Sequence, residues 1–131
     1  METQEILFLV GRILFGGFFL MSGINHFKGL CMLKGYAASK GVPAPGLAVA
    51  VSGLLMLVGG LGVILGVYIM WSVTALVLFL LPVTFIMHAY WKDTDPNMRM
   101  NNRINFMKNL ALLGAALMLL IISTPWVYSA F

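Results

Sequence analysis

Long apolar stretches dominate this sequence and recur along its whole length. Each is close to the roughly 20 residues that a helix needs to cross the hydrocarbon core of a bilayer. Inside that core the backbone must satisfy its own hydrogen bonds, which a single apolar stretch achieves only as a helix. We therefore predict an all-α membrane protein, a single transmembrane domain over residues 1–131, with four spans at about residues 6–27, 46–66, 70–91 and 103–123.

The composition leaves no room for a water-soluble alternative. Hydrophobic residues make up 61% of the chain and charged residues only 9%, whereas soluble domains carry about 25% charged residues. Too few polar side chains remain to cover a surface in water, so the lipid bilayer is the expected partner. The net charge of +4 comes from scattered basic residues that flank the spans, and we expect no nucleic-acid partner.

Short connections between the spans predict an up-down-up-down four-helix bundle. Between the first two spans, apolar residues at helical spacing lead into a turn at residues 41–45, which predicts a short interfacial helix there. Basic loops stay in the cytoplasm, so both termini should lie outside the cell (inner) membrane. The connections between spans one and two and between spans three and four hold seven of the eight basic residues: Lys28, Lys34, Lys40, Lys92, Arg99, Arg103 and Lys108.

A single arginine, Arg12, interrupts the first span. It lies about 9 Å into the helix at 1.5 Å per residue, a depth at which a charge needs a partner. The predicted spans contain no acidic residue, so the available partners are Glu2 or Glu5, helix-end carbonyls, Thr74 or a bound ligand. The alternative is that Arg12 extends to the outer interface and anchors the helix.

Glycines follow one face of the first span and crowd the second. Gly16 and Gly23 lie within about 40° of the Arg12 direction on a helix, and Gly59, Gly62 and Gly66 share a side of the next span. Small residues let helices approach closely in lipid, although the same surface leaves space for a flat ligand. We predict that these glycines serve helix packing.

Polar and aromatic side chains gather at the predicted cytoplasmic ends of the spans. Histidine can donate to a quinone carbonyl or move protons, and tryptophan can stack on a flat ring. The alternative is that these groups only satisfy one another across helices. We predict a ligand site that contains Asn25, His26, His88, Trp91, Lys108 and Asn109, with His88 on one helix face with Thr84.

No metal site or resident cofactor is predicted in this chain. His26, His88 and Asp93 lack ligand spacing within one helix, and the single Cys31 excludes a dithiol pair. The motifs of soluble enzymes are absent as well. We therefore expect no catalysis by this chain alone.

Three segments carry a resemblance to the DoxX family of small four-helix integral membrane proteins. They are Gly11–Gly16 continuing to Ser22–Phe27, then Gly53–Gly66, and Phe106–Gly114 with its Lys-Asn pair ahead of Ala-Leu-Leu-Gly. Members include a small subunit of a thiosulfate:quinone oxidoreductase and components of complexes that deal with oxidative stress. The resemblance implies an accessory, at most oxidoreductase, subunit with a quinone-like or other small hydrophobic ligand and a partner that holds the electron carrier.

One position departs from the family pattern, and two other functions compete with the redox role. Family members often carry a glutamate midway along the second helix, where this sequence has Met56, which cannot pair with Arg12.

The first competing function is an assembly or chaperone-like protein that docks a partner membrane protein, or a second copy, through its glycine faces. The second is a small-anion transporter with Arg12 as its filter.

Overall fold

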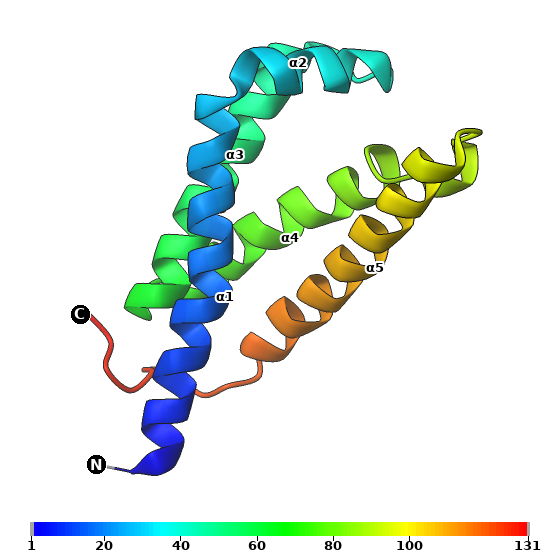
Figure 1. Cartoon of the computed structure of the whole chain (residues 1–131). Coiled ribbons are helices and arrows are strands. Elements are labelled where there is room, and N and C mark those ends of the chain that lie inside the picture. Colours follow the sequence, from blue (N-terminus) through cyan, green and yellow to red (C-terminus); the bar gives the residue numbers. More distant parts are fainter. Residues whose placement is uncertain (1, 131) are drawn as a thin grey trace.

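The computed structural model describes residues 2–130, and in them it contains helices and no strand (Figure 1). This confirms the all-α prediction. The elements in chain order are α1 (Thr3–Lys28), α2 (Leu30–Ser39), α3 (Pro45–Leu65), α4 (Ile69–Ile86), the 3₁₀ turn η1 (Tyr90–Lys92) and α5 (Pro96–Leu119).

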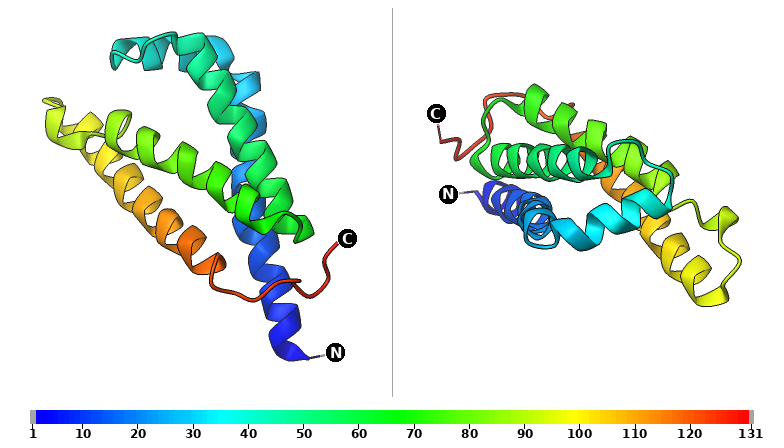
Figure 2. Two further views of the ribbon diagram at one scale, coloured as in Figure 1. Left: turned by 180° about the vertical axis from the view of Figure 1, so that it is seen from behind. Right: turned by 90° about the horizontal axis from the view of Figure 1, so that it is seen from above.

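The four long helices form two antiparallel pairs that diverge in a V. α1 lies beside α3, and α4 lies beside α5 (Figures 1 and 2). The pairs meet where α3 turns into α4, which we call the narrow end; α2 and η1 lie at the opposite, wide end. No Cα atom of α1 comes within 8 Å of one in α4 or α5, so α1 approaches these two helices less closely than it approaches α3.

Three helical segments are long and apolar enough to cross a membrane: Thr3–Lys28, Pro45–Leu65 and Ile69–Lys92. They make the chain a membrane protein. The fourth predicted span corresponds to α5, which has 24 residues but does not meet the same measure. Its first 14 residues carry Arg99, Arg103, Lys108 and five asparagines, which lower its hydropathy.

Several helix boundaries differ from the predicted spans. α5 starts at Pro96 rather than near residue 103, because the Asp95 side chain accepts from the backbone N–H of Met98 at 3.0 Å and caps the helix. α5 also ends four residues earlier than predicted, at Leu119. α4 ends at Ile86, so the prediction that His88 extends a face of this helix is wrong.

Two pairs of glycines bring α1 and α3 into backbone contact. A Cβ added at Gly16 would lie 2.6 Å from the Gly60 carbonyl oxygen, and one at Gly23 would lie 2.9 Å from that of Gly53. The two contacts are seven residues apart on each helix, which is about two helical turns. Continuing this register brings Arg12 opposite Ile64 at the end of α3.

Three further glycines face α4 or end α3. A Cβ at Gly59 would meet the Leu76 side chain at 2.5 Å, and one at Gly62 would overlap Ser72. Gly66 ends α3 with φ +71°, a conformation that favours glycine. All three residues are buried within the chain, so the glycine faces of α3 offer no free surface to a partner protein.

Candidate functional site

A cavity of about 320 Å³ lies inside the V toward its wide end. Its walls come from α1, α2, α3, α4 and α5 and are mostly apolar, with Met56 and Phe79 among them. A volume near 300 Å³ suits a small ring compound. The polar lining residues are Ser22, His26, Tyr36, Ser52, His88, Lys108 and Asn109.

The structure brings four of the six predicted ligand residues to this cavity and leaves two outside it. His26, His88, Lys108 and Asn109 line the wall. Asn25 is exposed and ends α1, where its backbone oxygen accepts from the Gly29 N–H at 2.8 Å.

Trp91 belongs instead to a separate aromatic cluster. Its side chain is 50% exposed, and its ring packs edge-on against Tyr90 and Phe106 with centroids 5.3 and 5.5 Å away. The early end of α4 explains this placement, because η1 turns the indole away from the α4 axis. Trp91 is therefore not in place to stack on a molecule in the cavity.

Asn109 is the most deeply buried polar residue of the cavity wall. It is 6% exposed, and its amide has no hydrogen-bond partner within residues 2–130. In that part of the chain every fully buried side-chain nitrogen or oxygen has a partner, so the two amide atoms of Asn109 keep some accessible surface, and the residue lines the cavity. An amide in this state can both donate to and accept from a bound molecule.

Lys108 spans the open side of the V. Its Nζ lies 5.2 Å from the centroid of the Phe18 ring on α1 and 3.5 Å from Asn105 Oδ1. None of the residues that line the cavity is acidic. The ammonium therefore has no counter-ion in the wall.

A chain of hydrogen bonds holds His88 from outside the cavity. The His88 Nδ1 lies 3.2 Å from Asn102 Oδ1, and Asn102 Nδ2 donates to Asp93 Oδ2 at 2.7 Å. Asp93 Oδ1 in turn accepts from Lys40 Nζ at 3.2 Å. This network (Lys40, Asp93, Asn102 and His88) ties the end of α2 to α5 across the wide end.

The network was not predicted, because only Asn102 lies in a helix, whereas Lys40, His88 and Asp93 lie in connecting segments that show no sequence periodicity. Asp93 was considered only as a metal ligand, and among the described residues no three histidine, cysteine or acidic side chains come together. The hydrogen bond from Asn102 holds the pKa of the Asp93 carboxyl below its usual value; burial opposes this, and Lys40 reinforces it.

Replacing Asp93 by asparagine is expected to lower the melting temperature at neutral pH but not in acid. Because the native pKa lies below the value of about 3.9 for an unfolded chain, the carboxylate stabilises the fold above about pH 4. That contribution is lost as the pH falls through the lowered native pKa. The melting temperatures of the wild type and of Asp93→Asn should become equal as the pH is lowered from 8 to 3. Adding Lys40→Gln to Asp93→Asn should lower the melting temperature no further. A difference in melting temperature that grows in acid would contradict the stabilising role of the Asp93 carboxylate.

Arg12 lies outside the cavity and is 1% exposed. Its guanidinium donates to two carbonyls at the end of α3, Val63 through Nε at 3.2 Å and Ile64 through Nη2 at 2.9 Å. It also donates to Val127 through Nη1 and to Tyr128 through Nη2 at 3.2 Å. Four backbone oxygens thus surround the cation, two of them at the negative end of a helix dipole.

These contacts decide among the partners predicted for Arg12. The helix-end carbonyls are its partners, whereas the Thr74 hydroxyl donates to the Met70 carbonyl at 2.6 Å. The rings of Phe8 and Trp126 lie 5.4 Å from its central carbon and close the cage. With its donors directed at the backbone, Arg12 is not in place to act as an anion filter.

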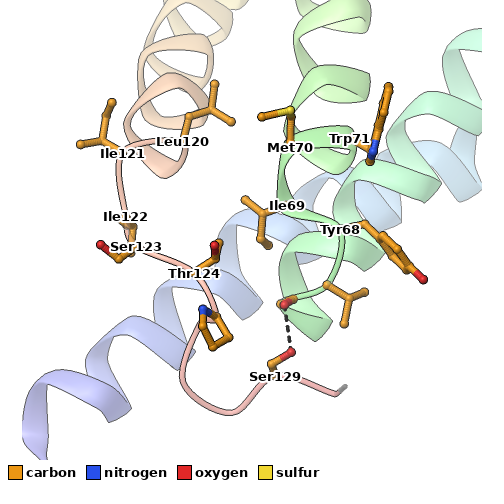
Figure 3. A pocket seen from close by; sticks show the side chains of 13 residues that line it. Tyr68, Ile69, Met70, Trp71, Leu120, Ile121, Ile122, Ser123, Thr124 and Ser129 are labelled. Atoms are coloured by element: carbon orange, nitrogen blue, oxygen red, sulfur yellow. Dashed lines mark hydrogen bonds between the residues drawn. The ribbon is translucent and has the colours of Figure 1, made fainter.

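A second cavity lies at the narrow end, between the α3–α4 turn and the segment after α5 (Figure 3). At about 770 Å³ it is larger than the first. Figure 3 shows Leu120 across from Met70, and the hydrogen bond that it draws joins Ser129 Oγ to the Gly66 carbonyl at 3.0 Å. Its lining residues include no histidine and no basic or acidic side chain.

Comparisons with known proteins agree with the fold and with the resemblance noted in the sequence. The DoxX family model matches residues 7–89, from the start of α1 to the residue before η1. The inner membrane protein YphA of Escherichia coli (strain K12) is 30% identical over 123 residues, which is 91% of this chain and 84% of YphA. No solved structure matches the chain. The chain belongs to the DoxX family.

Proposed function

We propose that this protein is an accessory subunit of a redox-linked complex in the inner membrane and that it binds a quinone-like molecule in the cavity inside the V. The observation that carries the proposal is the amide of Asn109, a residue that is only 6% exposed, lines the cavity and has no hydrogen-bond partner for its side chain within residues 2–130. A quinone carbonyl supplies an acceptor for this amide, and a second carbonyl supplies one for the Lys108 ammonium. The apolar wall accommodates the ring.

The shape of the bundle supports a ligand that arrives through the membrane. The backbones of α1 and α5 stay apart on one side of the cavity, and the Lys108 side chain crosses between them to Phe18. A molecule dissolved in lipid can enter a bundle through such a side opening. YphA is an inner membrane protein by name, and we assign the same membrane to this chain.

We further propose that α5 crosses the membrane as a fourth span and that α2 lies at the interface. The 24 residues of α5 extend about 36 Å at 1.5 Å per residue, enough for the roughly 30 Å core. Arg99 and Arg103 occupy the half nearest the wide end, where long side chains reach the interface, and Lys108 lies at the middle of the helix. The wide end then faces the cytoplasm, and the termini lie outside.

The accessory role follows from the chemistry of the cavity. Its wall offers hydrogen-bonding groups, a cation and an apolar surface, which bind and orient a ring. Electrons would come from a partner membrane protein. The two competing functions have less support, because the α3 glycines are packed inside the chain and the Arg12 donors are engaged.

Replacing Asn109 by leucine is expected to weaken quinone binding about tenfold, the effect of losing one hydrogen bond of roughly 1.4 kcal/mol. Isothermal titration of the protein in detergent with duroquinone measures this. Asn101→Leu is the matched control, because Asn101 is exposed on the same helix and does not line the cavity. Equal affinities for the two variants, or no binding by the unmodified protein, would contradict the proposal.

A further inference from the structure

The hydrogen on the His26 ring is assigned by its neighbour on α1. Its Nδ1 lies 2.9 Å from the Ser22 carbonyl oxygen, and a carbonyl can only accept. The hydrogen of a neutral ring is therefore on Nδ1, and Nε2 carries a lone pair. His26 offers the cavity an acceptor rather than a donor.

The hydrogen on the His88 ring is assigned by a longer path through the network. The Asp93 carboxylate only accepts, so the amide nitrogen of Asn102 must face it, at 2.7 Å. This leaves Asn102 Oδ1, which also only accepts, toward His88 Nδ1 at 3.2 Å. The His88 hydrogen is then on Nδ1, and its Nε2 carries a lone pair as well.

Both Nε2 atoms are available to a bound molecule. Neither has a hydrogen-bond partner in residues 2–130, and no buried side-chain nitrogen or oxygen in that range lacks one, so both atoms are accessible. Both rings line the cavity. At pH 8 an imidazole with the ordinary pKa of about 6.5 is neutral, and the wall then presents two nitrogen acceptors together with the donors of Lys108 and Asn109.

This pattern distinguishes the two redox forms of a quinone. An oxidised quinone carries carbonyl oxygens, which only accept and cannot pair with an imidazole lone pair. A hydroquinone carries hydroxyls, each of which donates one hydrogen bond and also accepts. We propose that the cavity binds the reduced, hydroquinone form in preference to the quinone. The inference rests on the proposed function, since it takes a quinone-type ring as the ligand.

The experiment compares three ring compounds of nearly the same shape. Duroquinol, duroquinone and the dimethyl ether of duroquinol are titrated into the protein in detergent at pH 8, without oxygen. The ether keeps acceptor oxygens but has no hydroxyl to donate. We expect duroquinol to bind at least about tenfold more tightly than the other two, the effect of one hydrogen bond to a buried acceptor.

Two variants test whether the histidines carry the preference. His26→Phe and His88→Phe keep an aromatic ring but remove the lone pair, and at least one should reduce duroquinol affinity while leaving duroquinone affinity unchanged. Asn101→Leu should retain the wild-type ratio. If duroquinone binds as tightly as duroquinol, the preference is wrong but the quinone site stands. If none of the three compounds binds, both proposals fail.

Discussion

Replacing Arg12 by methionine is expected to release the segment after α5 and destabilise the protein by about 3 kcal/mol. Methionine fills similar space but donates no hydrogen bond, so the Val63 and Ile64 carbonyls lose a donor at the end of α3. Val127 and Tyr128 lose theirs at the same time. A buried carbonyl without a donor costs about 1–3 kcal/mol, which makes this the largest effect of one polar side chain in the molecule.

Trp126 reports the release, because it is 3% exposed and lies over Arg12. In a protein whose Trp71 and Trp91 are replaced by phenylalanine, all tryptophan fluorescence comes from Trp126. Its emission maximum should move to longer wavelength in Arg12→Met. Arg12→Lys should give an intermediate result, since an ammonium keeps the charge but not the planar fork. Arg103→Met is the control, an exposed arginine without a partner among residues 2–130. An unchanged emission in Arg12→Met would contradict the cage.

Replacing Gly16 by leucine is expected to separate α1 from α3 and destabilise the protein by at least about 3 kcal/mol. Its first side-chain atom would lie 2.6 Å from the Gly60 carbonyl oxygen, and the obstacle is backbone, which cannot rotate away. The next residue supplies the control. Gly17 has nothing within 4 Å of an added Cβ, so Gly17→Leu should be neutral or slightly stabilising.

Unfolding in mixed micelles of increasing SDS content, followed by circular dichroism, measures both leucine variants. Gly23→Leu should resemble Gly16→Leu, because Gly23 meets the Gly53 carbonyl in the same register. If Gly16→Leu and Gly17→Leu unfold at a similar SDS content, the close contact between Gly16 and Gly60 is not needed for stability.

Periodicity predicted the features that lie along a single helix. Arg12, Gly16 and Gly23 were assigned to one face of the first span, and they are among the four buried residues of α1. Features set by local capping were missed. The Asp95 cap and the proline after it start α5 seven residues earlier than predicted, in a polar stretch that the apolar pattern could not mark as helix.

The candidate site could be predicted only in part, because it depends on contacts between elements. His26 and His88 line the cavity from near the wide ends of α1 and α4, whereas Lys108 and Asn109 line it from midway along α5. The pairing of Lys40 with Asp93, 53 residues apart, follows from the way α2 crosses the V and has no signature in the sequence.

The Arg12 cage also sets an order of events during biosynthesis. The arginine enters the membrane early, yet two of its four acceptors belong to residues 127 and 128, which are synthesised 115 residues or more later. Until then the first helix carries a cation with half of its partners absent. A nascent or truncated chain therefore exposes a polar defect that membrane quality control can recognise, and completion of the chain removes it.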